Sequence, residues 1–272
     1  MITLSMNGRD VTVPKGATIL EAARAAGERV PTLCHLKGLF PSGACRMCVV
    51  EVEGRAGLIP SCSYPAEHGM KVRTSSPRVM NARRTIAELL LASHPFDCLT
   101  CNRNGFCELQ KLASELDMEQ VAFKGAARHH APDFSSPAIV RTPDKCILCG
   151  RCVRVCEEIQ GVAAIDFTKR GFDTIVLPAF NADLSETSCV TCGQCVLACP
   201  TGALMSILMR FSFLGMKRDP SKCTKCGECV EACPMQVRIL DLSWEKFNDP
   251  ECTLCMECVE ACPTGALTPK FP

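Results

Sequence analysis

The chain has 272 residues, 30 Lys and Arg against 29 Asp and Glu, and 23 cysteines. Balanced charge leaves no basic excess to neutralise phosphates, so we expect no nucleic-acid partner. An odd cysteine count, with opening residues that do not resemble a secretory signal, speaks against a disulfide framework. It indicates thiolates that hold metal in a reducing compartment, the cytoplasm.

The first predicted elements are a hairpin and a short helix. Residues 2–6 and 11–13 alternate around the turn Asn7-Gly8, a strong hairpin signal. Thr18 and Glu21 have the spacing of a capping box, which predicts a short helix that stops at Gly27. Hairpin, helix and a following ligand loop, in that order, indicate a β-grasp ferredoxin domain over residues 1–77.

The first cysteine group follows that helix. Cys34, Cys45, Cys48 and Cys62 keep the C-x2-C pair and the distant fourth ligand of a plant-type [2Fe-2S] site, with a first gap of ten residues in place of four. A zinc knuckle is the alternative for these four thiols. We favour one [2Fe-2S] cluster.

A histidine precedes the second group. His94, Cys98, Cys101 and Cys107 have the spacing H-x3-C-x2-C-x5-C, between a helical stretch at 83–91 and an apolar-periodic stretch after Cys107. The residues alone leave three possibilities: a [4Fe-4S] cluster with His94 as a ligand, the same cluster with Asp97, or a three-cysteine [3Fe-4S] cluster. We expect a small helical domain over 78–120, then a linker over 121–140.

Four further groups each read C-x2-C-x2-C-x3-C, the run in which the fourth cysteine ligates the neighbouring cluster of a two-cluster ferredoxin. Cys156 lacks the proline that follows the other fourth cysteines. Zinc sites usually have two C-x2-C pairs separated by a dozen or more residues, which fits these runs poorly. The predicted ligand sets are Cys146, Cys149, Cys152 and Cys199; Cys189, Cys192, Cys195 and Cys156; Cys223, Cys226, Cys229 and Cys262; and Cys252, Cys255, Cys258 and Cys233.

The four runs make two bacterial-type 2[4Fe-4S] modules, at 141–205 and 219–272, joined by a connector at 206–218. Residues 198–204 and 261–267 have the same sequence, Ala-Cys-Pro-Thr-Gly-Ala-Leu. The apolar stretch 204–216 contains Arg210 and is too short to span a membrane; it is either a partner contact or a buried connector. The expected fold class is α+β, with one [2Fe-2S] and five [4Fe-4S] clusters on 24 ligands, the 23 cysteines and His94.

These motifs, in this order, resemble those of a known family. Residues 1 to about 205 are similar to the front half of the large iron–sulfur subunit of respiratory complex I and to the accessory domains of cytosolic [FeFe] hydrogenases. The resemblance implies His94 ligation and an electron relay whose [2Fe-2S] end lies near a flavin subunit. After Leu204 the sequence departs from both, because a second two-cluster module replaces the catalytic domain that we would otherwise expect.

Every cysteine is assigned to a relay cluster, and neither G-x-G-x-x-G nor a P-loop motif is present. We therefore expect no catalytic residue on this chain, and a flavin- and NAD(P)-binding subunit, a separate catalytic subunit and ferredoxin as partners. The leading hypothesis is the relay subunit of a soluble, electron-bifurcating hydrogenase. A formate dehydrogenase with the same relay, a free-standing polyferredoxin and a zinc-bound interaction module are the alternatives.

Overall fold

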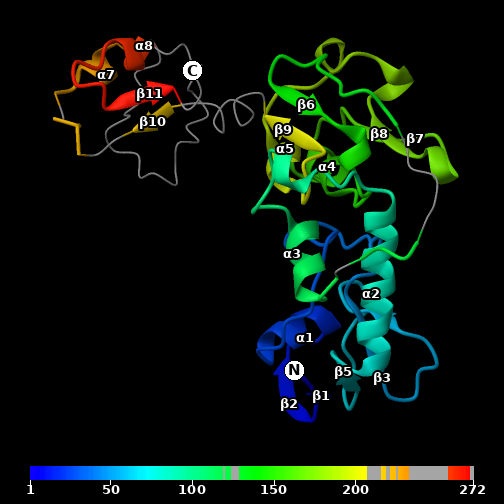
Figure 1. Ribbon diagram of the computed structural model, residues 1–272. Coiled ribbons are helices and arrows are strands. Elements are labelled where there is room, and N and C mark those ends of the chain that lie inside the picture. The colour runs from blue at the N-terminus through cyan, green and yellow to red at the C-terminus, as the bar shows by residue number, and fades with distance from the viewer. Residues whose placement is uncertain are drawn as a thin grey trace. The chain divides into compact units, whose positions relative to one another are not determined.

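The computed structural model describes residues 1–118, 120–123, 129–206, 216–218, 221–224, 226–232 and 257–269. The chain divides into two compact units, one formed by Met1–Ser136 with Arg141–Leu204 and the other by Pro137–Val140 with Met205–Pro272. The described elements are a mixed five-stranded sheet, three two-stranded sheets and short helices, which is consistent with the expected α+β class (Figure 1). No helix in the described part has the length and apolar character needed to cross a bilayer.

A five-stranded sheet forms the N-terminal region, in the order β2-β1-β5-β3-β4. Strand β1 runs parallel to β5, while the β1–β2, β3–β5 and β3–β4 pairs are antiparallel. Positive φ angles at Asn7 (51°) and Gly8 (85°) make the tight turn, which confirms the expected hairpin. The strands are β1 (Ile2–Met6), β2 (Arg9–Val13), β3 (Val49–Val52), β4 (Ile59–Pro60) and β5 (Lys71–Arg73).

Helix α1 (Ile19–Ala25) begins with the expected capping box. The Thr18 hydroxyl accepts the Glu21 N–H, and the Glu21 carboxylate accepts the Thr18 N–H at 2.7 Å. Its buried side chains join Leu4 and Met6 of the sheet in one hydrophobic core, which also contains Cys48 and Cys62. Two predicted ligands are therefore positioned by ordinary sheet–helix packing.

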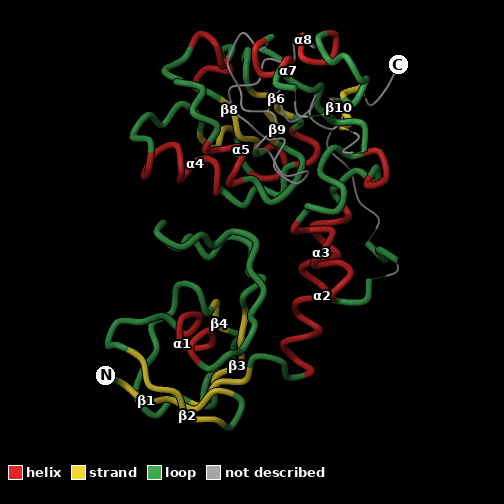
Figure 2. The backbone as a smooth tube through the Cα atoms, turned by 90° about the vertical axis from the view of Figure 1, so that its left-hand side faces the viewer, coloured by secondary structure: helices red, strands yellow, loops and turns green. Residues whose placement is uncertain are grey.

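Helix α2 (Pro77–Ala92) leads away from the sheet and packs against α3 (Glu108–Glu115), as Figure 2 shows. It begins well before the stretch at 83–91, because Ser76 caps it and Pro77 occupies the first turn. Cys107 is the residue from which α3 starts, as expected. The core between the two helices contains Ala87, Leu109 and Leu112, together with Leu33 and Met47 of the N-terminal region.

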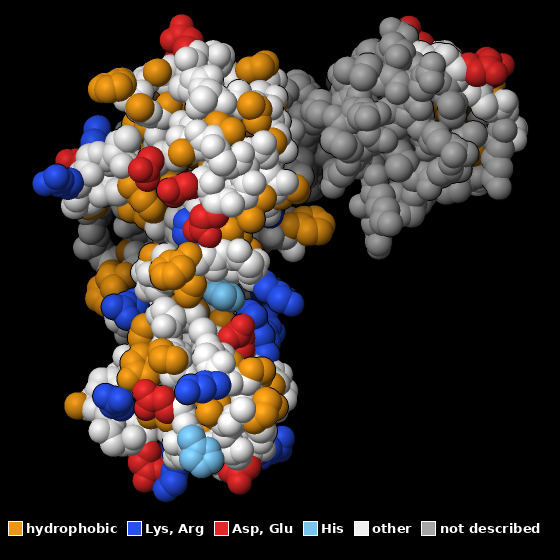
Figure 3. Space-filling view, turned by 180° about the vertical axis from the view of Figure 1, so that it is seen from behind, with side chains coloured by type: hydrophobic (Ala, Val, Ile, Leu, Met, Phe, Trp, Pro, Cys, Tyr) orange, Lys and Arg blue, Asp and Glu red, His pale blue; other side chains and the backbone are white. Residues whose placement is uncertain are grey.

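The rest of the first unit has short elements with buried apolar side chains such as Val153, Ile165 and Val196. A small cluster joins Val155 and Ala198 to Leu39 of the N-terminal region. Exposed hydrophobic side chains lie among charged ones over the face that Figure 3 shows, and Leu99 and Phe180 are almost fully exposed. The elements are β7 (Asp166–Thr168) paired with β8 (Ile175–Leu177), α4 (Arg151–Arg154), a π-helical turn at Val155–Ile159, and α5 (Gln194–Ala198). Strand β6 (Ile139–Arg141) pairs with β9 (Leu204–Ser206), and most residues of both strands belong to the second unit.

The second unit is described in part. Strands β10 (Met216–Arg218) and β11 (Leu267–Pro269) are antiparallel, and α7 (Glu228–Glu231) contacts α8 (Glu257–Glu260). The predicted ligands Cys233, Cys252 and Cys255, and most of the connector at 206–218, lie outside the described residues.

Candidate metal centres

The four N-terminal cysteines lie together. Cys34, Cys48 and Cys62 are at most 1% exposed, and Cys45 is half-buried. Hydrogen bonding from the Cys62 thiol lowers the pKa of Cys48 to about 6, and bonds from Cys45 and Cys62 lower the pKa of Cys34. The pKa values of Cys45 and Cys62 rise in turn, because each donates to a neighbouring thiolate. Four buried thiols that share negative charge in this way fit as ligands of the cationic core of a metal cluster.

The backbone between the cysteines has an unusual conformation in several groups. Arg46, Leu148 and Thr191 each lie inside a C-x2-C pair with positive φ angles for these non-glycine residues: 56°, 52° and 53° respectively. This left-handed conformation turns successive N–H groups toward one side of the chain, and the Leu148 N–H donates to the Cys146 sulfur at 3.4 Å. Hydrogen bonds from these N–H groups to a bound group can offset the conformational strain, which fits N–H donors directed at cluster sulfurs.

One predicted set lines a single cavity. Cys146, Cys149, Cys152 and Cys199 all border it, with apolar neighbours such as Ile147 and Leu204. Burial raises the pKa of Cys149 to about 12 and raises that of Cys152 well above its usual value, because an isolated thiolate is poorly solvated there. Four thiols grouped around one cavity, two of them with raised pKa values, suit a [4Fe-4S] cluster.

The structure brings the next predicted set together, including Cys156 from the neighbouring run. Burial raises the pKa of Cys195 to about 12, and Cys192, Cys189 and Cys156 are the neighbouring thiols that raise it further. Cys156 lies in the π-helical turn, where its sulfur accepts the Ala164 N–H at 3.3 Å. A π-turn redirects a side chain without a proline, which explains how Cys156 reaches the other set.

In the second unit, burial raises the pKa of Cys229, and the neighbouring Cys226, Cys262 and Cys223 raise it further, so this predicted set also lies together. The repeated Cys-Pro-Thr segment makes the same contact twice. The Thr hydroxyl lies 3.8 Å from the Cys199 sulfur in the first unit and 3.7 Å from the Cys262 sulfur in the second. Cys258 is buried, and its three predicted co-ligands lie outside the described residues.

The position of His94 suits the role of a ligand. Its Nδ1 lies 3.0 Å from the Pro95 carbonyl oxygen, and its buried Nε2 has no hydrogen-bond partner in the described part of the chain. Burial lowers the pKa of His94, which favours the neutral imidazole that binds metal. Burial raises the pKa of Cys107, and the neighbouring Cys101 and Cys98 raise it further, so the three cysteines lie together.

The alternative ligand Asp97 also lies beside the cysteines. Its Oδ2 pairs with Lys145 at 2.7 Å, while its buried Oδ1 has no hydrogen-bond partner among the described residues. Lys145 also donates to the Cys101 sulfur at 3.3 Å, so it holds the carboxylate near these thiols. The geometry therefore suits either side chain, and the choice of His94 rests on the family resemblance.

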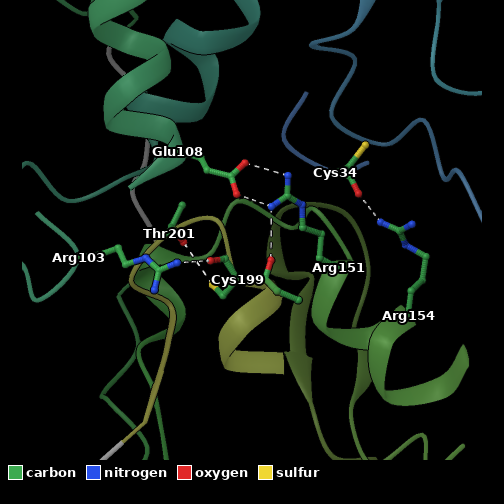
Figure 4. Close-up of polar contacts among 8 residues, drawn as sticks. Cys34, Arg103, Glu108, Arg151, Arg154, Cys199 and Thr201 are labelled. Carbon is green, nitrogen blue, oxygen red and sulfur yellow. Dashed lines mark hydrogen bonds and ion pairs between the residues drawn. The ribbon is translucent and has the colours of Figure 1, made fainter. Parts of the chain in front are cut away.

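Three arginines connect the cysteine groups of the first unit (Figure 4). Arg151 of α4 forms a two-pronged ion pair with Glu108, at 2.6 and 2.9 Å, next to Cys107. Arg154, from the same helix, donates to the Cys34 carbonyl oxygen at 2.5 Å, and Arg103 donates to the Cys199 carbonyl oxygen at 3.2 Å. Each link ends on a predicted ligand or its neighbour, so it fixes one cysteine group relative to another.

Sequence reasoning missed these basic residues and Lys145. Their one local signal is position: Lys145 and Arg151 each directly precede a predicted ligand.

Within the described parts of the chain, no three His, Cys, Asp or Glu side chains converge as a single metal ion requires.

Family models match successive parts of the chain. A "2Fe-2S iron-sulfur cluster binding domain" matches residues 1–77, and the "NADH-ubiquinone oxidoreductase-G iron-sulfur binding region" matches 83–122. A "4Fe-4S dicluster domain" matches twice, at 145–203 and 215–263. The presence of both 2Fe-2S and 4Fe-4S domains is thereby confirmed.

Known proteins resemble three quarters of the chain. NADP-reducing hydrogenase subunit HndD of Solidesulfovibrio fructosivorans is 45% identical over 75% of this chain and 36% of its own length. The NADH-ubiquinone oxidoreductase 75 kDa subunit of Reclinomonas americana is 36% identical over 76% of this chain and 29% of its own. The chain therefore spans about a third of the length of these two curated relatives.

A solved structure extends the match to three dimensions. A chain of an NAD+-reducing [NiFe]-hydrogenase in the H2-reduced state matches with a TM-score of 0.71 and 33% identity. The match covers 76% of this chain and 87% of that one. The resemblance found in the sequence is confirmed by both comparisons.

Proposed function

Because the chain belongs to the family of iron–sulfur proteins that includes the NADH-ubiquinone oxidoreductase 75 kDa subunit and NADP-reducing hydrogenase subunit HndD, we propose that it is the electron-relay subunit of a multisubunit NAD(P)-linked hydrogenase. One observation carries this proposal: the cysteine groups of the first unit adjoin one another. Lys145, which directly precedes Cys146, donates to the Cys101 sulfur at 3.3 Å, and Arg103, from the second group, donates to the Cys199 carbonyl oxygen at 3.2 Å. Ligand sets this close suit electron transfer between clusters.

The proposed inventory is a β-grasp domain with one [2Fe-2S] cluster, a His94-ligated [4Fe-4S] cluster, and two modules with two [4Fe-4S] clusters each. The 24 predicted ligands are just enough for these six clusters, which leaves no cysteine for a catalytic metal. We therefore assign the flavin, the nicotinamide site and the hydrogen-activating metal to other subunits. The many thiols favour a reducing compartment, the cytoplasm.

The second dicluster module supplies a further electron exit beyond the part shared with the relatives. A relay that joins a flavin subunit, ferredoxin and a hydrogenase subunit is the arrangement that electron bifurcation needs. We therefore propose bifurcation, with the second module as the branch toward ferredoxin or toward the catalytic subunit. A variant complex that lacks residues 217–272 should keep electron entry from NAD(P)H and lose one of the other two reactions.

The test is anaerobic purification of the tagged chain from its native host. A flavin-binding chain and a hydrogenase chain should co-purify, and each relay chain should hold about 22 iron atoms. Hydrogen should reduce NAD(P) with the complex, while the relay chain alone should be inert to hydrogen, formate and NAD(P)H. Formate activity would identify the alternative dehydrogenase, a lone iron-loaded chain would identify a polyferredoxin, and zinc in place of iron would contradict the proposal.

A further inference from the structure

Arg83 is a charged residue in a position that usually takes an apolar one. It lies on the buried stripe of α2 between Val79 and Ala87, and it is 3% exposed. Charged side chains are rarely buried to this degree unless they are paired, because transfer of the charge from water is costly. The position therefore requires a compensating interaction.

Hydrogen bonds compensate only the polar part of that cost. The Arg83 Nε donates to the Met47 carbonyl oxygen at 3.2 Å, and its Nη2 donates to the Val49 carbonyl oxygen at 2.9 Å. These carbonyls belong to the residues on either side of Cys48, so the guanidinium brackets a predicted ligand. Carbonyl groups are neutral, and the positive charge still lacks a counter-charge.

No carboxylate supplies that charge in the described part of the chain, where none of the ion pairs includes Arg83. Its two hydrogen bonds place the guanidinium beside Cys48, the predicted cluster ligand between the two acceptor residues. Burial lowers the pKa of Arg83 to about 10, and Cys48 opposes this, so the guanidinium remains charged at neutral pH. Its counter-charge is thus at the metal centre.

A [2Fe-2S] cluster with four thiolate ligands is an anion, and one-electron reduction makes it more negative. A fixed positive charge nearby stabilises the reduced form more than the oxidised form, and burial weakens the screening of that effect. We propose that Arg83 is the buried counter-ion of the cluster held by Cys34, Cys45, Cys48 and Cys62, and that its charge raises the reduction potential of this cluster. The inference rests on the proposed function only in that a [2Fe-2S] cluster binds here.

The experiment is a redox titration of the iron-loaded full chain, in which a chemical mediator supplies one electron and EPR reports the [2Fe-2S] signal. Arg83→Gln should lower the equilibrium constant for reduction about tenfold, equivalent to about 59 mV for one electron. Arg83→Lys keeps the charge and should stay near the wild-type potential. The matched control is Arg84→Gln, because exposed Arg84 on the same helix donates to the Leu116 carbonyl oxygen and should not affect this cluster.

Cluster content, from iron analysis and EPR spin count, covers the case in which a variant does not assemble. Arg83→Met, which fills the space with apolar atoms, then joins the series. Loss of the [2Fe-2S] cluster in the Gln and Met variants but not in the Lys variant would support the counter-ion role. A fully loaded Gln variant with an unchanged potential, a Lys variant that shifts as much as Gln, or cluster loss in all three would overturn it. None of these readings needs a partner subunit, so they are independent of the hydrogenase assignment.

Discussion

The sheet region at 1–77 and the dicluster region at 141–204 differ in how their predicted ligand thiols are packed. In the sheet region, Cys48 and Cys62 belong to a continuous core formed by the strands and α1. In the dicluster region, buried apolar side chains such as Val153, Ile165 and Val196 belong to short elements, and four predicted ligands line a cavity. The comparison sets one predicted ligand group inside the core of a sheet against another that borders a cavity between short elements.

The largest expected difference follows from iron removal. Anaerobic chelation should unfold 141–204, because metal ligation carries most of its folding free energy, while the sheet at 1–77 should persist. Hydrogen exchange followed by mass spectrometry should show amide protection falling at least about a thousandfold in the first region and little in the β1–β2 hairpin. Equal protection of both regions without iron would show that the dicluster core is stable by itself.

His94 provides the next test, at a ligand group outside the sheet core. His94→Cys should retain a four-iron cluster whose potential is lower by on the order of 100 mV, since thiolate adds negative charge. His94→Ala should alter that one cluster's EPR signal and leave the others unchanged. Asp97→Asn is the control, and it should keep the cluster. If only the Asp97 variant altered the spectrum, Asp97 would be the ligand.

The Arg151–Glu108 ion pair tests how the dicluster region is attached to helix α3. The Arg151 side chain is 5% exposed, so Glu108→Gln leaves a buried charge poorly compensated and should cost about 2 kcal/mol of unfolding free energy. Glu115→Gln is the matched control, because it breaks the Arg29–Glu115 pair, whose side chains are 69% and 32% exposed. That loss should be below about 1 kcal/mol. Denaturation of iron-loaded protein, followed by visible absorbance, measures both, and equal losses would mean that burial of Arg151 contributes nothing.

The smallest effect is expected within the sheet region. Thr18→Ala removes the side-chain half of the capping box of α1 and should cost about 1 kcal/mol. Thr18→Ser keeps the hydroxyl and should be close to wild type. Hydrogen exchange of the α1 amides in the iron-loaded chain provides the measurement. An unchanged Ala variant would indicate that packing of Ile19 and Leu20, and not the cap, determines where α1 begins.

The local features of this protein follow from sequence alone, because each depends on residues a few positions apart. The Asn7-Gly8 turn, the Thr18–Glu21 box and the start of α3 after Cys107 are all present in the structure. The early start of α2 also has a local cause. Ser76 and Pro77 form a standard helix cap, but the apolar periodicity of 83–91 does not extend to them. Cysteine spacing likewise grouped thiols that the structure brings together.

Only the tertiary structure decided which charged side chains act on those thiols. Arg83 reaches the residues flanking Cys48 across 34 to 36 positions, and Arg154 reaches the Cys34 carbonyl oxygen across 120. In the sequence, Arg83 and Arg84 are adjacent and chemically identical, yet one is buried and the other is exposed. The physical reason is that solvation of a charge depends on which distant segments cover it, and that covering is settled only when the sheet, helices and ligand loops pack together.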